Sequence, residues 1–298
     1  MDTSSYWSTL LKYCLVIAFG LCLSACSDDD DDDNSSDRNA GPSAPETRTG
    51  EFLDSAVAGL RFVSGAQEGT TDASGTFTYE VGEAVSFFIG NIELGSAQGA
   101  DLITPLDLVP GAGDETDPTV TNMIRLLQTL DDDGMVDNGI QITDTVAQQA
   151  TGSINFNQSP AEFEADGDVQ ILVAELTALT GAGARTLVSV DDAQNHFNLT
   201  LIGLLQGDYS GTFTGDDSGT FDFSIDDAGA ITGSGYSNSD NATFTVTGQA
   251  NSDRTAAAGN TDIGASFEMT LNQDGSVAGT WYNSIWNESG TFSGSKNE

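Results

Sequence analysis

The chain has 298 residues, which is long enough for two domains of ordinary size, and its 46 acidic and 8 basic residues give a formal net charge of −38 at pH 7. Because this charge repels phosphate groups, the composition excludes a nucleic-acid-binding protein. The three cysteines, Cys14, Cys22 and Cys26, all lie near the N-terminus, so the rest of the chain has no thiol for a disulfide, a thiolate metal site or a cysteine nucleophile.

An apolar run at residues 13–23 follows Lys12 and is shorter than the ~20 residues that a membrane-spanning helix needs, so it predicts an export signal. The run ends in Leu23-Ser24-Ala25-Cys26, which resembles the lipobox of bacterial lipoproteins. The resemblance implies a signal peptide over residues 1–25, cleavage before Cys26, and lipidation of Cys26 on its thiol and, with an acyl chain such as palmitate, on its amino group. The alternative is an ordinary signal peptide with a chance cysteine.

A lipid anchor at Cys26 would hold the protein at a membrane of the cell envelope without crossing it, since each buried CH₂ contributes ~0.8 kcal/mol. In the lipoprotein family an aspartate after the cysteine favours the inner membrane. Ser27 stands there, so the resemblance implies the outer membrane. Residues 26–50, with aspartates at 28–33, predict an acidic disordered tether. Such tethers resemble those of surface-exposed lipoproteins, but a solvated spacer explains them equally well, so periplasmic or surface exposure stays open.

Residues 51–112 contain short runs of alternating apolar residues separated by glycine and aspartate, which predicts a small antiparallel β-sandwich. Within it, Asp72 and Gly75 are expected to shape a turn, and Phe77 and Tyr79 are expected to lie on one face of the following strand. This Thr-Asp-x-x-Gly-x-Phe pattern resembles carboxypeptidase-regulatory-like modules, and the resemblance implies an immunoglobulin-like fold without catalytic residues.

More broadly, residues 54–131 resemble a recurrent class of uncharacterised proteobacterial lipoproteins, which implies relatives but no activity.

In residues 113–207 the apolar residues recur at the three- and four-residue spacing of a helix. Asp117-Pro118, Ser159-Pro160-Ala161-Glu162 and Ser189 are expected to begin three helices, which we predict to pack on the sandwich.

Residues 208–298 are rich in glycine, serine and threonine and contain an internal repeat. Residues 218–233 match residues 264–279 at one constant offset, so that Phe221 corresponds to Phe267, 46 positions later. Each copy reads as a β-hairpin, and about eight short strands are expected in all. A meander of this length protects its edges by closing into an up-and-down barrel or by stacking as a sandwich. The predicted fold class is therefore mainly β with a helical middle.

The acidic loop at residues 131–139 presents the carboxylates of Asp131, Asp133 and Asp137 close to glycines that allow the backbone to bend, and hard oxygen ligands suit Ca²⁺. The loop resembles part of the calcium loops of EF-hand or dockerin-type repeats. It departs from them at its twelfth position, where Ile142 provides no carboxylate. A solvated connection between a helix and a strand is the alternative.

Catalytic motifs are missing from the sequence: it has no Gly-x-Ser-x-Gly, no His-Glu-x-x-His and no phosphate-binding Gly-x-x-x-x-Gly-Lys. His196, the single histidine, would suit a Ser-His-Asp arrangement but no His-rich metal site. We therefore predict a protein that is not an enzyme. A hydrolase with an unrecognised nucleophile is a further hypothesis, besides the two non-enzymatic functions given below.

Trp281, Tyr282 and Trp286 cluster near the end of the second repeat and are the candidate ligand-binding residues. They would line a barrel mouth for an apolar or sugar ligand, or else fill the barrel as core. Residues 279–283 are similar to a strand of avidin-like barrels. The sequence predicts a ligand- or partner-binding accessory lipoprotein, for example in uptake of a hydrophobic compound. The alternative is a surface adhesin or structural module stiffened by calcium.

Overall fold

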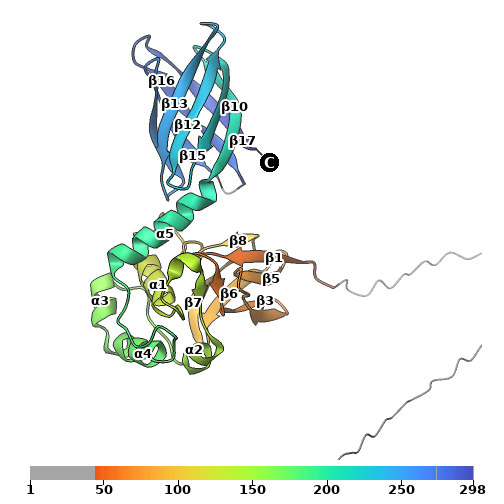
Figure 1. The fold of residues 1–298 in the computed structure, drawn as a ribbon. Helices are drawn as coiled ribbons and strands as arrows, with labels where there is room; N and C mark the ends of the chain where they lie inside the picture. The colour runs from red at the N-terminus through yellow and green to blue at the C-terminus, as the bar shows by residue number, and fades with distance from the viewer. Residues whose placement is uncertain (1–43, 273, 298) are drawn as a thin grey trace, which may run out of the picture. The chain divides into compact units, whose positions relative to one another are not determined.

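The computed structural model of the protein describes residues 44–297 except residue 273, and the chain is mainly β (Figure 1). The predicted signal peptide, Cys26 and most of the predicted tether lie outside the described residues. The first strand, β1 (Thr47–Phe52), pairs with β5 and includes the last residues of the predicted tether. The predicted tether boundary at residue 50 was therefore placed too late, because the polar residues at the start of β1 are held by main-chain pairing and not by apolar burial.

Small β-sheets make up the first part of the described chain. One has the order β5-β1-β8, a second has the order β4-β3-β6-β7, and β2 pairs with β9. The strands besides β1 are β2 (Val57–Ala58), β3 (Arg61–Ser64), β4 (Gln67–Thr70), β5 (Thr76–Glu80), β6 (Ala84–Ile89), β7 (Ile92–Gln98), β8 (Leu102–Ile103) and β9 (Ile140–Gln141). The rings of Phe52, Phe77 and Phe87 meet in their shared core, with centroids 4.6 Å apart for Phe52 and Phe87 and 5.0 Å apart for Phe77 and Phe87.

The pairing of two of these strands differs from the antiparallel sandwich that the sequence predicts. β1 pairs with β8 in parallel, and β2 pairs with β9 in parallel. Parallel neighbours require a long connection. Several other elements lie between β1 and β8 in the chain, and between β2 and β9. The alternation of apolar residues shows which face of a strand is buried but not the direction of its partner, so the immunoglobulin-like identity stays a prediction.

The turn before β5 has the local structure that the sequence predicts. The Asp72 Oδ1 atom accepts hydrogen bonds from the backbone N–H groups of Ser74 and Thr76, both at 2.9 Å, and Gly75 has φ +75°. Phe77 and Tyr79 are both buried on one face of β5.

Helices occupy most of residues 118–205. They are α1 (Pro118–Thr129), α2 (Asp144–Gln149), α3 (Pro160–Ala165), α4 (Gly167–Thr177) and α5 (Val190–Leu205), with a 3₁₀ turn at Val136–Asn138. Asp117 caps α1, Ser159 forms a capping box with Glu162, and Ser189 caps α5, as their spacing predicts. Over the part of the chain that the structure describes, no helix has the length and apolar character needed to cross a membrane.

Arg125 ties the helical region together from a fully buried position on α1. Its guanidinium donates to the carbonyl of Val188 at 2.7 Å, to that of Pro160 at 3.2 Å and to the carboxylate of Glu164 at 2.9 Å. A buried charge is tolerated only when its donors are paired, so these three contacts fix the positions of α1, α3 and the segment before α5.

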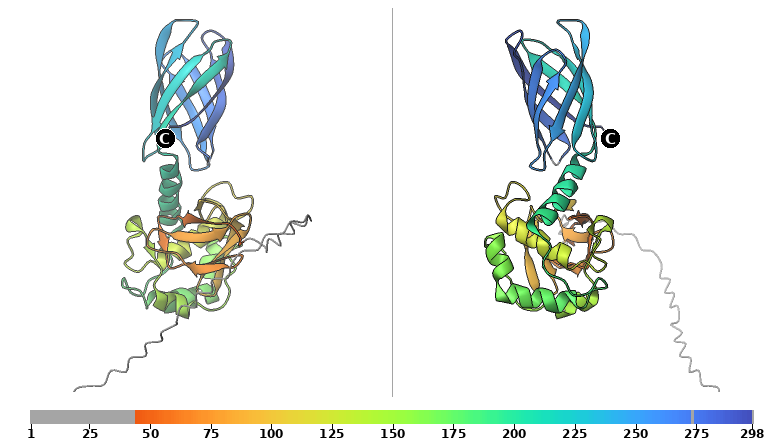
Figure 2. Two further views of the ribbon diagram at one scale, coloured as in Figure 1. Left: turned by 90° about the vertical axis from the view of Figure 1, so that its right-hand side faces the viewer. Right: turned by 60° about the vertical axis from the view of Figure 1, so that its left-hand side comes forward.

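The C-terminal part is a closed antiparallel barrel whose eight strands follow one another in chain order (Figures 1 and 2). β17 pairs back with β10, so the sheet has no free edge. Closure decides between the two alternatives that the sequence left open, in favour of the barrel. The strands are β10 (Gly207–Gly215), β11 (Gly219–Ile225), β12 (Ala230–Ser237), β13 (Ala242–Ala250), β14 (Thr255–Thr261), β15 (Ala265–Leu271), β16 (Ser276–Asn283) and β17 (Glu288–Lys296).

The barrel is a duplication of a four-stranded unit. β11, β12 and β13 begin and end 46 positions before β15, β16 and β17, and β10 ends 46 positions before β14. The correspondence between the two units extends to individual hydrogen bonds. The Tyr236 hydroxyl donates to Asn241, the Tyr282 hydroxyl donates to Asn287, and both asparagines have a positive φ. The repeat visible in the sequence as one hairpin therefore extends over the whole barrel.

Aromatic rings fill the barrel beside glycines on the neighbouring strand. Gly279 is opposite Phe292, and a Cβ atom at this glycine would lie 2.5 Å from the ring. Gly235 and Phe244 form an equivalent pair. A side chain at either glycine would occupy the volume that a ring already fills, so glycine at these positions relieves crowding inside the barrel.

Candidate ligand-binding site

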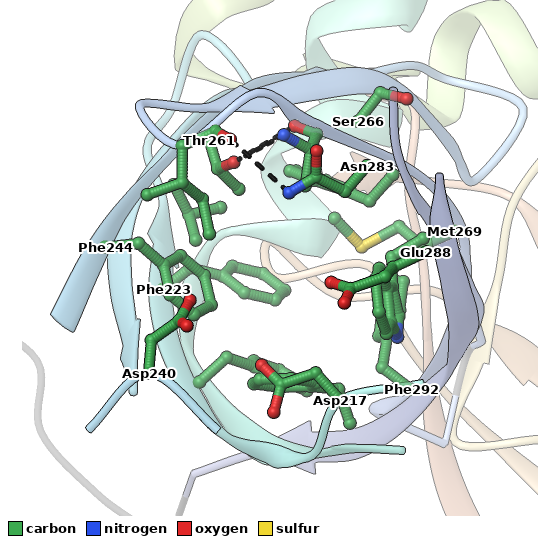
Figure 3. A pocket seen from close by; sticks show the side chains of 17 residues that line it. Asp217, Phe223, Asp240, Phe244, Thr261, Ser266, Met269, Asn283, Glu288 and Phe292 are labelled. Carbon is green, nitrogen blue, oxygen red and sulfur yellow. Dashed lines mark hydrogen bonds between the residues drawn. The ribbon is translucent and has the colours of Figure 1, made fainter. Parts of the chain in front are cut away.

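The barrel contains an apolar cavity of about 80 Å³ at one end (Figure 3). This end, called the mouth here, carries the four hairpin loops at residues 216–218, 238–241, 262–264 and 284–287. One water molecule needs roughly 10–15 Å³, so the cavity has room for a larger guest.

The opposite end of the barrel is closed by side chains from α5 and β10. Leu205, the last residue of α5, belongs to the barrel core, and the Tyr209 hydroxyl donates to its carbonyl at 2.8 Å. Tyr209 in turn stacks on Phe223, with ring centroids 5.1 Å apart. Phe223 lines the cavity, so this stack separates the cavity from the α5 end.

The cavity wall is built almost wholly from inward-facing residues of the strands. Its apolar members are Phe213, Phe221, Phe223, Phe244, Val246, Ile263, Ala265, Phe267, Met269, Trp281 and Phe292. Most of these residues were not predicted as ligand contacts. The alternation along each strand indicates that they face inward, but only the barrel's closure shows that they surround a cavity rather than fill a sandwich.

The three aromatic residues predicted to bind a ligand do not act together. Trp281 lines the cavity, where its indole Nε1 donates to the Thr214 carbonyl at 3.2 Å and its ring lies edge-on to Phe213. Tyr282, the next residue on β16, is 45% exposed on the outside of the barrel, and Trp286, in a mouth loop, is 68% exposed. The period of two along a strand sends Trp281 and Tyr282 to opposite faces.

The mouth has two unlike halves, although both descend from the same repeat. Three loop positions of the first unit carry polar or acidic residues, and the positions 46 residues later carry apolar ones. The paired positions are Asp217 and Ile263, Ser239 and Ile285, and Asp240 and Trp286. We call the first set the acidic rim and the second the apolar rim. Because the strands are in chain order around the barrel, each rim covers a continuous half of the mouth.

Within the acidic rim, the Asp217 Oδ1 atom accepts hydrogen bonds from the hydroxyl of Ser239 at 2.5 Å and from the backbone N–H groups of Ser239 at 3.2 Å and Ser218 at 2.6 Å. Partial burial by itself raises the pKa of Asp217, but these hydrogen bonds outweigh it and leave the pKa below its ordinary value. Asp217 therefore carries its negative charge at neutral pH.

The three predicted calcium ligands lie in two separate environments. The Asp137 carboxylate lies 3.3 Å from His196 Nδ1, whereas Asp131 is buried beside Asp133, and the Arg185 guanidinium donates to the Asp131 carbonyl. Within residues 44–297, as far as the structure describes them, no group of three or more His, Cys, Asp or Glu side chains is placed to hold a metal ion. Calcium binding at this loop stays a prediction, with no geometry in its favour.

His196 lies in a polar cluster that has the residue types of a Ser-His-Asp triad. Its Nε2 atom is 3.1 Å from Ser55 Oγ, with Asp137 on the other ring nitrogen, and Ser55 has φ +55° in a tight turn. A second carboxylate, that of the fully buried Asp54, lies 3.7 Å from the same Nε2. The sequence reasoning missed Ser55 and Asp54, because no motif marks them.

The other contacts of this cluster indicate a structural network. The Ser55 N–H donates to Thr200 Oγ1, so this amide is not available as an oxyanion donor. The Gln128 side chain donates to Asp54 and also to the Ala193 carbonyl. The cluster thereby joins the turn at residues 53–56 to α1 and α5. Burial raises the pKa of Asp54 to about 7, which makes its ionisation costly.

Comparison of the chain with protein-family models, with curated proteins and with solved structures found no match.

Proposed function

We propose that the protein is a ligand-binding protein without enzymatic activity, whose C-terminal barrel holds the apolar part of a small ligand in the cavity at its mouth. The observation that supports this proposal is the apolar, aromatic-lined cavity, closed towards α5 and open between the mouth loops (Figure 3). Pockets of this kind at a barrel mouth are typical ligand sites, and each CH₂ that a ligand buries contributes ~0.8 kcal/mol.

We further propose that the protein works in the cell envelope as a lipoprotein anchored through Cys26, at the outer membrane. A signal sequence that ends in a lipobox supports this proposal. In this setting the barrel would present or pass on an apolar compound as an accessory to its uptake. The alternative function, a surface adhesin or structural module, is supported by the aspartates at residues 28–33 and by the exposed apolar rim. Protease treatment of intact cells separates the two, because an adhesin must be accessible from outside.

The binding proposal is tested with a neutral, environment-sensitive apolar dye such as phenylnaphthylamine, titrated against the full chain. We expect saturable binding that Trp281→Ala weakens by at least about tenfold, because truncating a central aromatic contact typically costs more than 1.4 kcal/mol. Tyr282→Ala is the matched control, since it removes an aromatic ring from the neighbouring position on the outer face.

Equal loss of dye binding in the two variants would contradict a site inside the barrel. Non-saturable binding in the wild type would overturn the ligand-binding function itself. Circular dichroism of each variant checks that the fold is intact, and Trp281→Phe keeps an apolar ring for the case in which the alanine variant does not fold.

A further inference from the structure

Three carboxylate side chains line the apolar cavity at the mouth. Asp217 and Asp240 belong to the acidic rim, and Glu288 begins β17. Figure 3 shows their carboxylates around the opening, pointing towards the cavity over the aromatic wall. A charge beside apolar walls is weakly screened, so it acts more strongly on a bound group than a charge on the open surface.

Among the residues that the structure describes, no basic side chain is placed at the mouth to balance these carboxylates. The barrel sequence, residues 207–298, contains Arg254 and Lys296 as its only basic residues. Both lie at the α5 end: the Arg254 carbonyl accepts from the N–H of Leu271, at the last position of β15, and the Lys296 side chain lies against Gly207. The mouth therefore has a uniformly negative potential, which attracts cations and repels anions.

The spacing of the carboxylates argues against a metal ion as the occupant. Over the described residues, no three carboxylate or imidazole groups come close enough together to share a metal. An occupant that satisfies both the charge and the wall must combine a cationic head with an apolar body.

We propose that the barrel's ligand is a cationic amphiphile, such as a protonated alkylamine, whose apolar chain enters the aromatic cavity while its charged head stays at the mouth among Asp217, Asp240 and Glu288. This inference rests on the ligand-binding function proposed above and specifies its ligand class. The divergence of the repeat fits it, because the acidic rim supplies two of the three carboxylates, Asp217 and Asp240, whereas the apolar rim extends the apolar wall outward. Glu288, the third carboxylate, comes from the second unit.

The test uses three probes with the same six-carbon chain: hexylamine, which is protonated at neutral pH, hexanol, which is neutral, and hexanoate, which is an anion. Each competes with bound phenylnaphthylamine on the full-length protein. We expect hexylamine to displace the dye at a concentration at least about tenfold below that of hexanol, and hexanoate to be the weakest. Added salt should reduce the preference for hexylamine.

The matched variants remove equal charge from the two ends of the barrel. The mouth variant is Asp217→Asn with Asp240→Asn and Glu288→Gln. Asparagine at 217 keeps the Oδ1 acceptor that the loop uses. We expect this variant to bind hexylamine and hexanol about equally while retaining the dye.

The control variant, Asp226→Asn with Asp253→Asn and Asp274→Asn, changes the α5 end and should keep the preference for hexylamine. Similar displacement by hexylamine and hexanol in the wild type, with the dye still bound, would overturn the inference and leave the proposed function standing. A preference that both variants lose equally would also overturn it, by assigning the effect to net charge. Failure of every probe and of the dye to bind would instead refute the proposed function.

Discussion

The buried carboxyl group of Asp54 makes the stability of the N-terminal part depend on pH. The side chain is fully buried, and burial raises its pKa from 3.8 to about 7, although the hydrogen bond from Gln128 lowers it. In the unfolded chain the group has its ordinary pKa. Below about pH 4 both states hold the proton and no penalty applies. As the pH rises towards 7 the unfolded state loses the proton first, so the folded state is progressively destabilised.

A difference of about three between the two pKa values corresponds to roughly 4 kcal/mol of stability lost between about pH 4 and pH 7. Asp54→Asn removes this ionisation and keeps an oxygen that accepts from Gln128. We therefore expect the variant to gain stability relative to the wild type as the pH rises, with the difference levelling off above the folded-state pKa. The His196 Nε2 atom lies 3.7 Å from the Asp54 carboxylate, so the informative quantity is the difference in stability between two proteins that both contain His196.

The assay is urea unfolding at a series of pH values, followed by far-ultraviolet ellipticity, which reports the helices of residues 118–205. Glu175→Gln, an exposed change on α4, is the control and should track the wild type at every pH. If the stability of Asp54→Asn also runs parallel to that of the wild type from about pH 4 to pH 8, Asp54 does not ionise at a raised pKa and the reasoning from its burial is wrong.

Three further changes test the packing. Arg125→Met should lower the free energy of unfolding by about 3–5 kcal/mol, because three acceptors lose their donor, as measured by far-ultraviolet ellipticity in urea. Gly279→Ala should destabilise the barrel by about 1–3 kcal/mol, because the new Cβ atom would overlap Phe292, whereas Gly113→Ala, with no atom within 4 Å, should be nearly neutral in the same tryptophan-fluorescence melt. Leu205→Ala should cost about 2–5 kcal/mol in the barrel transition while leaving the ellipticity transition of the other helices in place; a loss confined to the helices would contradict its position in the barrel core.

Local structure was predictable from the sequence where one short-range pattern determines it. The caps at Asp117, Ser159 and Ser189 and the turn at Asp72 depend on side chains that bond to the backbone two or three residues away, and each is formed. The hairpins of the barrel were predictable as well, because each copy of the repeat has alternating apolar residues on both sides of a short turn. The long-range pairing of strands was not predictable. β1 and β2 pair in parallel with segments that are distant in the sequence, and the residue pattern of a strand does not show the direction of its partner.

The candidate site was predicted only in part for a related reason. Aromatic clustering in the sequence singled out Trp281, Tyr282 and Trp286, but the strand alternation keeps only Trp281 inside the barrel. The acidic rim could in principle have been found in the sequence, because alignment of the two repeats matches Asp217 with Ile263. That comparison becomes informative only when closure of the barrel shows that these positions surround one opening.

An apolar ligand inside the barrel would lie beside Trp281, which lines the cavity, so short-range fluorescence quenching tests the proposed binding site directly. The chain has three tryptophans, Trp7, Trp281 and Trp286, so two full-length proteins can each retain a single barrel tryptophan after Trp→Phe changes at the other two positions. Both are titrated with bromohexane, whose heavy atom quenches only on contact. We predict saturable quenching of the protein that retains Trp281 and only weak, linear quenching of the protein that retains Trp286. Saturable quenching of Trp286 alone, or linear quenching of both, would contradict a binding site within the barrel.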